Sequence, residues 1–111
     1  MRKGIRAGSS RFTPGYQARQ RWQRKVDRAR QVPIMDVARY IGCGPFEDAG
    51  RSELRCLCVF HRESHPSLFL NTEKGLWYCH GCGVGADAIA LYMLGTGVSF
   101  KQAVVEMAKR F

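Results

Sequence analysis

The spacing of apolar positions changes several times along the chain, and each change predicts a different element. In three segments apolar residues recur every three or four positions, which is the period of a helix with one buried face. In three others they alternate or form short apolar runs between turn residues, as strands do. The predicted helices begin near residues 33, 86 and 99, and the predicted strands cover 53–59, 67–71 and 76–79.

Turn residues set the limits of the first elements. Gly42 and Gly44 follow the apolar positions that begin after Pro33, so the first helix is predicted to end there. Residues 45–52 are predicted to be a turn-like connection. Glu73-Lys74-Gly75 is predicted to be a hairpin turn between the last two strands.

Two short helices are predicted after the last strand. The helix over 86–94 is apolar, and Gly95 and Gly97 are predicted to break it. Ser99-Phe100-Lys101-Gln102 has the form of a capping box, which begins the last helix. The buried side of that helix is expected to carry Phe100, Ala103, Val104, Met107 and Ala108.

The chain is predicted to divide into a basic extension over residues 1–32 and a domain over residues 33–111. Residues 1–16 are rich in Gly, Ser and Arg and are predicted to be disordered. Residues 17–31 are good helix formers with a thin apolar stripe. They fit either a solvated charged helix or coil, or a basic helix that folds on nucleic acid or on a partner protein. The Trp at position 22 favours the second interpretation.

Positive charge is concentrated in this extension. The net charge is +9, and residues 1–31 hold ten Lys or Arg and one acid, while residues 32–111 hold eight of each sign. Nonspecific attraction to polyanions is therefore expected in the extension rather than in the domain. Its candidate nucleic-acid contacts are Arg21, Arg24 and Lys25.

Four residues in the domain have the spacing of a structural zinc site. Cys58-x2-His61 is the first ligand hook and Cys79-x2-Cys82 is the second. Thiolate and imidazole ligands suit a tetrahedral Zn²⁺, and four protein ligands leave no open position for a substrate. One Zn²⁺ is therefore expected to stabilise the fold, with a binding free energy of roughly 10–16 kcal/mol that acts as folding free energy.

Residues near the hooks leave alternatives open. Cys56 and Cys58 face the same side of a strand, so either could approach the metal, although only Cys58 has the two-residue spacing to a His. His65 and His80 could coordinate, but they are expected to be exposed polar side chains. Cys43 is expected to be a small buried or helix-end thiol, with a redox-active cysteine pair as the alternative. The G-x-G-x-G string at 81–85 lacks the strand–loop–helix unit of a nucleotide loop.

With these residues in place, the chain resembles the zinc-binding domain of bacterial and phage DnaG-type DNA primases over residues 33–110. That family has a C-P-F-H hook followed by E-K-T-P-S-F, and then Y-x-C-F-G-C-G-x-x-G-D. Cys58-Val59-Phe60-His61 matches the first hook, with Glu63, Pro66 and Ser67 in register after it, and CHGCG at 79–83 matches the second, followed by Asp87. The departures are Val59, Ser64, His65 and His80. The resemblance implies a small α+β fold, in which a zinc ribbon with an antiparallel sheet of three to five strands is flanked by short helices.

The resemblance also implies a function in DNA replication. It points to recognition of single-stranded template DNA for RNA primer synthesis, and such sites combine cations with aromatic platforms. Candidate contacts in the domain are Arg55, Arg62, Lys74 and Tyr78. Trp77 and Tyr78 fall on opposite faces of one strand, so one of them should be buried and the other exposed.

Catalysis is expected to lie elsewhere. Primases of this family hold catalytic metal through clustered carboxylates of a TOPRIM core, and this chain has no paired carboxylates, so no catalytic residue is predicted. A separate TOPRIM subunit, a replicative helicase or both are the expected partners. The alternative functions are a stand-alone zinc-ribbon nucleic-acid-binding or regulatory protein, and a replisome adaptor.

The sequence also indicates where such a protein would work. There is no signal peptide and no apolar run long enough to span a membrane, so no membrane partner is expected. Metal-bound thiolates fit a reducing compartment. The expected location is the cytoplasm of a bacterial or phage-infected cell, with a phage or mobile element as the expected source.

Overall fold

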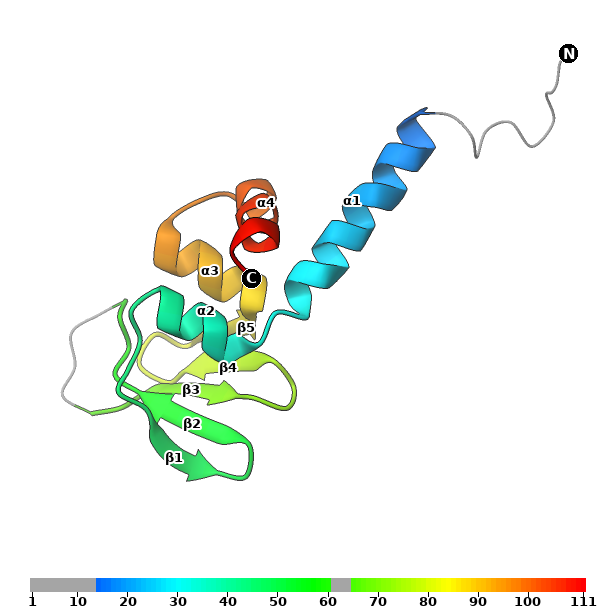
Figure 1. The fold of residues 1–111 in the computed structure, drawn as a ribbon. Helices are drawn as coiled ribbons and strands as arrows, with labels where there is room; N and C mark the ends of the chain where they lie inside the picture. Colours follow the sequence, from blue (N-terminus) through cyan, green and yellow to red (C-terminus); the bar gives the residue numbers. More distant parts are fainter. Residues whose placement is uncertain (1–13, 61–64) are drawn as a thin grey trace, which may run out of the picture.

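Five short strands form one antiparallel sheet in which each strand pairs with the next along the chain (Figure 1). The structure, a computed structural model, describes residues 14–60 and 65–111. The strands are β1 (Glu47–Gly50), β2 (Glu53–Cys56), β3 (Leu68–Asn71), β4 (Leu76–Cys79) and β5 (Val84–Asp87). This sheet and its flanking helices confirm the predicted fold class.

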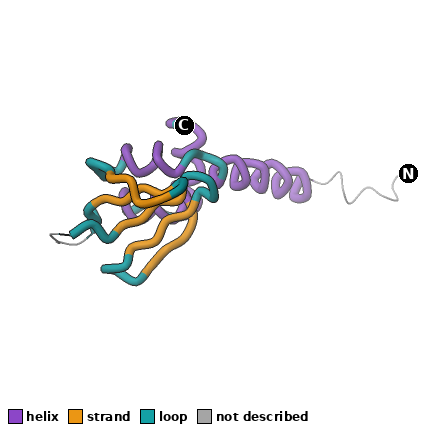
Figure 2. The backbone as a smooth tube through the Cα atoms, turned by 90° about the horizontal axis from the view of Figure 1, so that it is seen from below, coloured by secondary structure: helices purple, strands orange, loops and turns teal. Residues whose placement is uncertain are grey.

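Helices cover one face of the sheet and leave the other open. Three of them, α2 (Ile34–Tyr40), α3 (Ala88–Thr96) and α4 (Phe100–Arg110), pack together above the strands. The fourth, α1 (Pro14–Arg30), packs against α4 and α3 and then extends beyond the edge of the sheet (Figures 1 and 2). The core therefore lies between the sheet and the helical layer.

Alternation along β3 and β4 separates the buried face of the sheet from the open face. Leu68, Leu70 and Trp77 point into the core, while their neighbours Phe69 and Tyr78 point the other way. Trp77 is 4% exposed and Tyr78 is 44% exposed, which confirms that one of the pair is buried. The hairpin predicted between these strands is present: the side chain of Asn71 accepts hydrogen bonds from the amides of its turn residues 73 and 74.

Two of the five strands were not predicted from the sequence. Residues 45–52 were predicted to be a turn-like connection, but they contain β1, which pairs with β2. Residues 86 and 87 were predicted to be helical, but they belong to β5, which pairs with β4. Both strands are polar or glycine-rich, so their extended conformation comes from pairing with a neighbour rather than from their own composition. Strand β2 is shorter than predicted and ends at Cys56, before the first ligand hook.

Helix α1 begins at Pro14, although residues 14–16 were predicted to be disordered. The prediction for residues 1–13 lies outside the described residues. Val26 and Ala29 are buried in the core and Trp22 is partly buried against it, so the C-terminal half of α1 is held by packing. The division into residues 1–32 and 33–111 as separate units stays a prediction.

Gly95 does not break its helix as predicted, because α3 continues to Thr96. A Cβ at Gly95 would lie 2.5 Å from Cγ2 of Ile41, so glycine allows close packing of α3 against the end of α2. Gly97 ends the helix in the left-handed conformation, with φ of 79°.

Helix α4 begins at the predicted capping box. Ser99 accepts a hydrogen bond from the amide of Gln102 at 3.2 Å. Ala103, Val104 and Met107 are buried as expected. Phe100 and Ala108 are exposed, against the prediction, because they lie at the margin of the buried stripe. Within the described residues no single helix has the length and apolar character to cross a membrane, although α3 and α4, bent by 102° at their break, pass that test as a pair on length and composition alone.

Candidate metal centre and nucleic-acid interface

Three cysteines meet where the first hook approaches the turn between β4 and β5. The sulfur atoms of Cys58, Cys79 and Cys82 all lie within 4.8 Å of one another, and those of Cys58 and Cys82 are 3.7 Å apart. Tetrahedral zinc with Zn–S bonds of about 2.3 Å holds its sulfur ligands about 3.8 Å apart. The cluster therefore fits a structural Zn²⁺.

Hydrogen-bond donors surround these sulfurs. The Phe60 amide donates to Sγ of Cys58, and the Cys82 amide donates to Sγ of Cys79, both at 3.3 Å. The hydroxyl of Ser67 lies 3.5 Å from Sγ of Cys79. Donors of this kind favour thiolates, which are the form that binds zinc.

The two buried cysteines of the cluster differ in their proton affinity without metal. Burial raises the pKa of Cys58 to about 12, although the Phe60 amide opposes that effect. Burial acts in the same direction on Cys79, but hydrogen bonds from Ser67 and from the Cys82 amide outweigh it and hold its pKa below the usual value. Zinc binding must therefore displace a proton from Cys58 in particular.

The fourth predicted ligand, His61, lies outside the described residues, and so does the candidate contact Arg62. The assignment of Cys58, His61, Cys79 and Cys82 as the full ligand set accordingly stays a prediction. Among the described residues the cluster contains only the three cysteines, so the alternative ligands His65 and His80 are not part of it.

Cys56 also lies apart from that cluster. It is buried at the end of β2, where it forms a hydrogen bond with Cys43. That hydrogen bond, with burial, raises the pKa of Cys43 far above its usual value. Cys43 is 8% exposed, so it is the small buried thiol that the sequence predicted.

The open face of the sheet carries a row of cross-strand neighbours. Arg55 of β2 pairs with Phe69 of β3, Phe69 pairs with Tyr78 of β4, and Tyr78 pairs with Gly85 of β5. A Cβ at Gly85 would lie 2.7 Å from Cδ1 of Tyr78, so the glycine leaves room for the tyrosine ring. Arg55 donates to Glu47 of β1 at 2.8 Å, which partly neutralises its charge.

Three aromatic rings gather on this face. The ring of His80 stands edge-on to Phe69, with centroids 5.0 Å apart, and also to Tyr78, at 4.9 Å. Beside them lies a groove of about 260 Å³, whose lining includes Phe69, Tyr78 and Lys74 of the hairpin. The structure therefore brings three of the predicted contacts, Arg55, Lys74 and Tyr78, to one face.

Sequence reasoning missed Phe69 and His80 as members of this surface. The signal was present, because Phe69 lies between two buried leucines in β3 and strand alternation turns it to the open side. The other predicted contacts, Arg21, Arg24 and Lys25, lie exposed on α1 and not on this face.

Comparison with known proteins agrees with these features. Residues 46–111 match the model of the CHC2 zinc finger family. The DNA primase of Aquifex aeolicus is 37% identical over 83 residues, which is 74% of this chain and 16% of that protein. The DNA primase of Pseudomonas aeruginosa is 41% identical over 61 residues, which is 55% of this chain and 9% of that protein.

A solved structure has the same fold. The crystal structure of the Aquifex aeolicus primase, with its zinc-binding and RNA polymerase domains, superposes with a TM-score of 0.68 at 35% identity. The superposition covers 78% of this chain and 21% of that one. The chain thus spans a small part of the primases that it matches. The cysteine cluster, the five-stranded sheet and these matches together show that the chain belongs to the CHC2 zinc finger family of DnaG-type primases.

Proposed function

We propose that this chain recognises single-stranded template DNA for RNA primer synthesis, through the open face of its zinc-supported sheet. The observation that carries the proposal is the group of aromatic rings formed by the half-buried Phe69 and the exposed Tyr78 and His80. Membership of the primase zinc finger family supports the same function.

The chemistry of the open face suits an unpaired strand. Tyr78 is 44% exposed, so a base could stack on its ring without a change of fold. Stacking of this kind contributes roughly 1–3 kcal/mol per base and tolerates any sequence. Lys74, at the edge of the neighbouring groove, is placed to meet a phosphate. Arg55 would have to give up its hydrogen bond to Glu47 to contact a phosphate. Arg62 remains a predicted contact outside the described residues.

Zinc has a structural role in this proposal. Cys58, Cys79, Cys82 and His61 would hold it, and the bound metal would cross-link the first hook to the turn after β4. Bound zinc would hold the segment after β2 against the end of β4, beside the sheet whose register places Arg55 and Tyr78 on one surface. Nothing in this role requires an open coordination position.

Bond formation is assigned to a partner. The chain covers only 16% of the Aquifex aeolicus primase, and the solved structure of that protein joins a zinc-binding domain to an RNA polymerase domain. We propose a separate TOPRIM subunit as the source of the catalytic centre, and a replicative helicase as a further partner. The alternative is a stand-alone nucleic-acid-binding protein, for which DNA binding would have no effect on primer synthesis.

Binding measurements test the surface. Tyr78→Ala should weaken binding of a fluorescein-labelled 16-nucleotide single strand by roughly 5- to 150-fold, the equivalent of about 1–3 kcal/mol. Leu94→Ala is the matched control, because Leu94 is 51% exposed on α3, away from the open face. Equal affinity of the two variants would overturn the assignment of this face.

An assay with a catalytic partner tests the role. The chain is added to a primase RNA polymerase domain that lacks its own zinc domain, and primer synthesis on a single-stranded template is measured. Cys79→Ser should abolish any stimulation, because it removes a ligand that is buried in the core. Primer synthesis that is undiminished by this substitution, or never stimulated by the chain, would refute the primase role and favour the stand-alone alternative.

A further inference from the structure

Helix α1 carries a stripe of four cations along one side. Arg21, Arg24, Lys25 and Arg28 are spaced at i, i+3, i+4 and i+7, which places them on one side of a helix, and all four are exposed. Among the residues that the structure describes, none of the four forms an ion pair. We call these four residues the α1 stripe.

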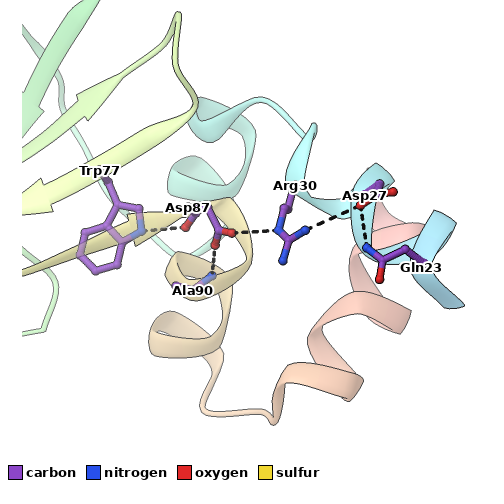
Figure 3. Close-up of polar contacts among 6 residues, drawn as sticks. All are labelled: Gln23, Asp27, Arg30, Trp77, Asp87 and Ala90. Carbon is purple, nitrogen blue, oxygen red and sulfur yellow. Dashed lines mark hydrogen bonds and ion pairs between the residues drawn. The ribbon is translucent and has the colours of Figure 1, made fainter. Parts of the chain in front are cut away.

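The single acid of α1 is turned away from this stripe. Asp27 accepts a hydrogen bond from Gln23 at 2.9 Å and lies 3.7 Å from the guanidinium of Arg30 (Figure 3). Gln23 and Arg30 belong to the other side of the helix. The positive charge of the α1 stripe is therefore not offset by a neighbouring carboxylate of its own helix.

The helix that carries the stripe is fixed to the sheet. Val26 and Ala29 are buried in the core. Arg30 lies 3.5 Å from the carboxylate of Asp87, which also accepts the Ala90 amide at 3.0 Å at the start of α3 (Figure 3). The orientation of the α1 stripe is thus set by the same core that shapes the sheet.

The α1 stripe and the open face lie on different sides of the molecule. Helix α1 packs on α4 and α3, in the layer that covers the buried face of the sheet (Figures 1 and 2). Lys25 and Arg28 border a small groove formed with the end of α4, where Phe111 contributes apolar surface. A ligand on the α1 stripe would therefore leave the ring cluster around Tyr78 accessible.

We propose that the α1 stripe binds the phosphate backbone of nucleic acid, as a second surface that is separate from the open face. The inference rests on the proposed function only in taking nucleic acid as the partner. Seven residues of helix cover about 10 Å, a length along which duplex DNA presents about six charges. Contacts to phosphates need only cations and other donors, so the surface would not select sequence.

The composition of α1 favours nucleic acid over a protein partner. A protein interface needs an apolar centre, but the stripe itself consists of charged residues, and the groove beside Lys25 and Arg28 holds only about 50 Å³. The exposed large apolar residue of the described part of α1 is Tyr16, which lies at the opposite end of the helix from Arg28. An acidic protein segment is therefore the less favoured occupant.

The test compares two variants of the full chain with equal charge. The stripe variant is Arg21→Gln/Arg24→Gln/Lys25→Gln/Arg28→Gln. The control removes four exposed cations from three parts of the chain, as Arg19→Gln on α1, Arg51→Gln in the turn after β1, and Lys101→Gln/Lys109→Gln on α4. Zinc content and circular dichroism show whether both variants are folded. If the stripe variant is not folded, Arg21→Gln/Arg24→Gln is used in its place.

Binding is measured to a labelled 20-base-pair duplex and to one of its strands, between 50 and 200 mM KCl. The stripe variant should lose more than tenfold in affinity, and its slope of log K against log salt should fall by up to about 3–4 for the duplex. If the stripe variant loses affinity for the duplex, the α1 stripe binds the phosphates of a duplex. If it loses affinity for the single strand alone, the α1 stripe binds the phosphates of the single-stranded template. The control should lose less than half as much.

Other outcomes would overturn the proposal. An unchanged affinity and salt slope in the stripe variant would do so, as would an equal loss in the dispersed control. Unchanged DNA binding together with loss of a copurifying acidic protein would assign the α1 stripe to that protein instead. Tyr78→Ala separates the two surfaces, because it should weaken single-strand binding and leave duplex binding unchanged. If Tyr78→Ala has no effect on single-strand binding while the stripe variant loses affinity, the proposed function fails and the proposal for the α1 stripe stands.

Discussion

Substitution of Asp87 should reveal how the sheet, α3 and α1 are joined. Its carboxylate caps α3 by accepting the Ala90 amide at 3.0 Å and lies 3.5 Å from Nε of Arg30 on α1. Its backbone carbonyl accepts a hydrogen bond from Trp77 at 2.8 Å, which a side-chain substitution leaves in place (Figure 3). Asp87→Ala removes the cap and the ion pair together, whereas Asp87→Asn removes only the charge.

The two contributions can be estimated separately. Loss of an N-cap costs about 1 kcal/mol, and Asn caps about as well as Asp. The side chains of Arg30 and Asp87 are 51% and 33% exposed, so their ion pair contributes between about 0 and 1 kcal/mol. Asp87→Ala should therefore lower the free energy of unfolding by about 1–2 kcal/mol, and Asp87→Asn by less than about 1 kcal/mol.

Urea unfolding of the zinc-loaded protein measures both values, with Asp48→Ala on the edge strand β1 as the control that should change little. For a domain of this size, 1 kcal/mol corresponds to about 4–8 °C in Tm. An Arg30→Gln background should remove the difference that comes from the ion pair. If Asp87→Asn destabilised as much as Asp87→Ala, the cap would not be the larger contribution and the reasoning would fail.

Three further outcomes are expected. Gly95→Ala should cost about 1–3 kcal/mol in urea unfolding, because the new Cβ would lie 2.5 Å from Ile41, and Ile41→Ala should reduce that cost. Chelation of zinc, followed by metal analysis and circular dichroism, should unfold the sheet, and Cys79→Ser should do so without a chelator. The hydroxyl of Tyr92 donates a hydrogen bond to Glu106 and lowers the pKa of that carboxyl group. This contact therefore stabilises the fold at neutral pH, and the stabilisation is lost as pH falls below the usual glutamate range. In thermal unfolding from pH 7 to pH 3, Glu106→Gln should lose less stability on acidification than the wild type.

The sequence predicted the elements whose own residues determine them. Strand β4 was predicted with its observed bounds, since Leu76 to Cys79 is an apolar run between a turn and a ligand hook. The capping box at Ser99 and the buried stripe of α4 follow from local spacing in the same way. The three clustered cysteines follow from hook spacing, because the two-residue interval turns both sulfurs of the second hook to one side.

The misses concern residues whose partners are distant in sequence. Strand β1 carries acidic residues and forms because Glu47 pairs with Arg55 across the sheet. The packing of Gly95 against Ile41 and the ion pair between Arg30 of α1 and Asp87 join residues far apart in sequence, which a helical pattern cannot reveal. Such contacts form only in the folded protein, so they cannot be predicted from the composition of a segment alone.

The position of the cysteines suggests how one metal could organise two surfaces. Cys58 follows β2 and Cys79 ends β4, so a metal between them would fix two strands that are not neighbours, with β3 held in between. Phe69 and Tyr78, which pair on the open face, belong to the two strands between these cysteines, β3 and β4. Strand β5 begins just after Cys82 and ends at Asp87, which forms an ion pair with Arg30 of α1. Helix α1 packs on α3 and α4, and α3 packs on β4 and β5, so the proposed cationic helix and the proposed template surface depend on the same folded ribbon.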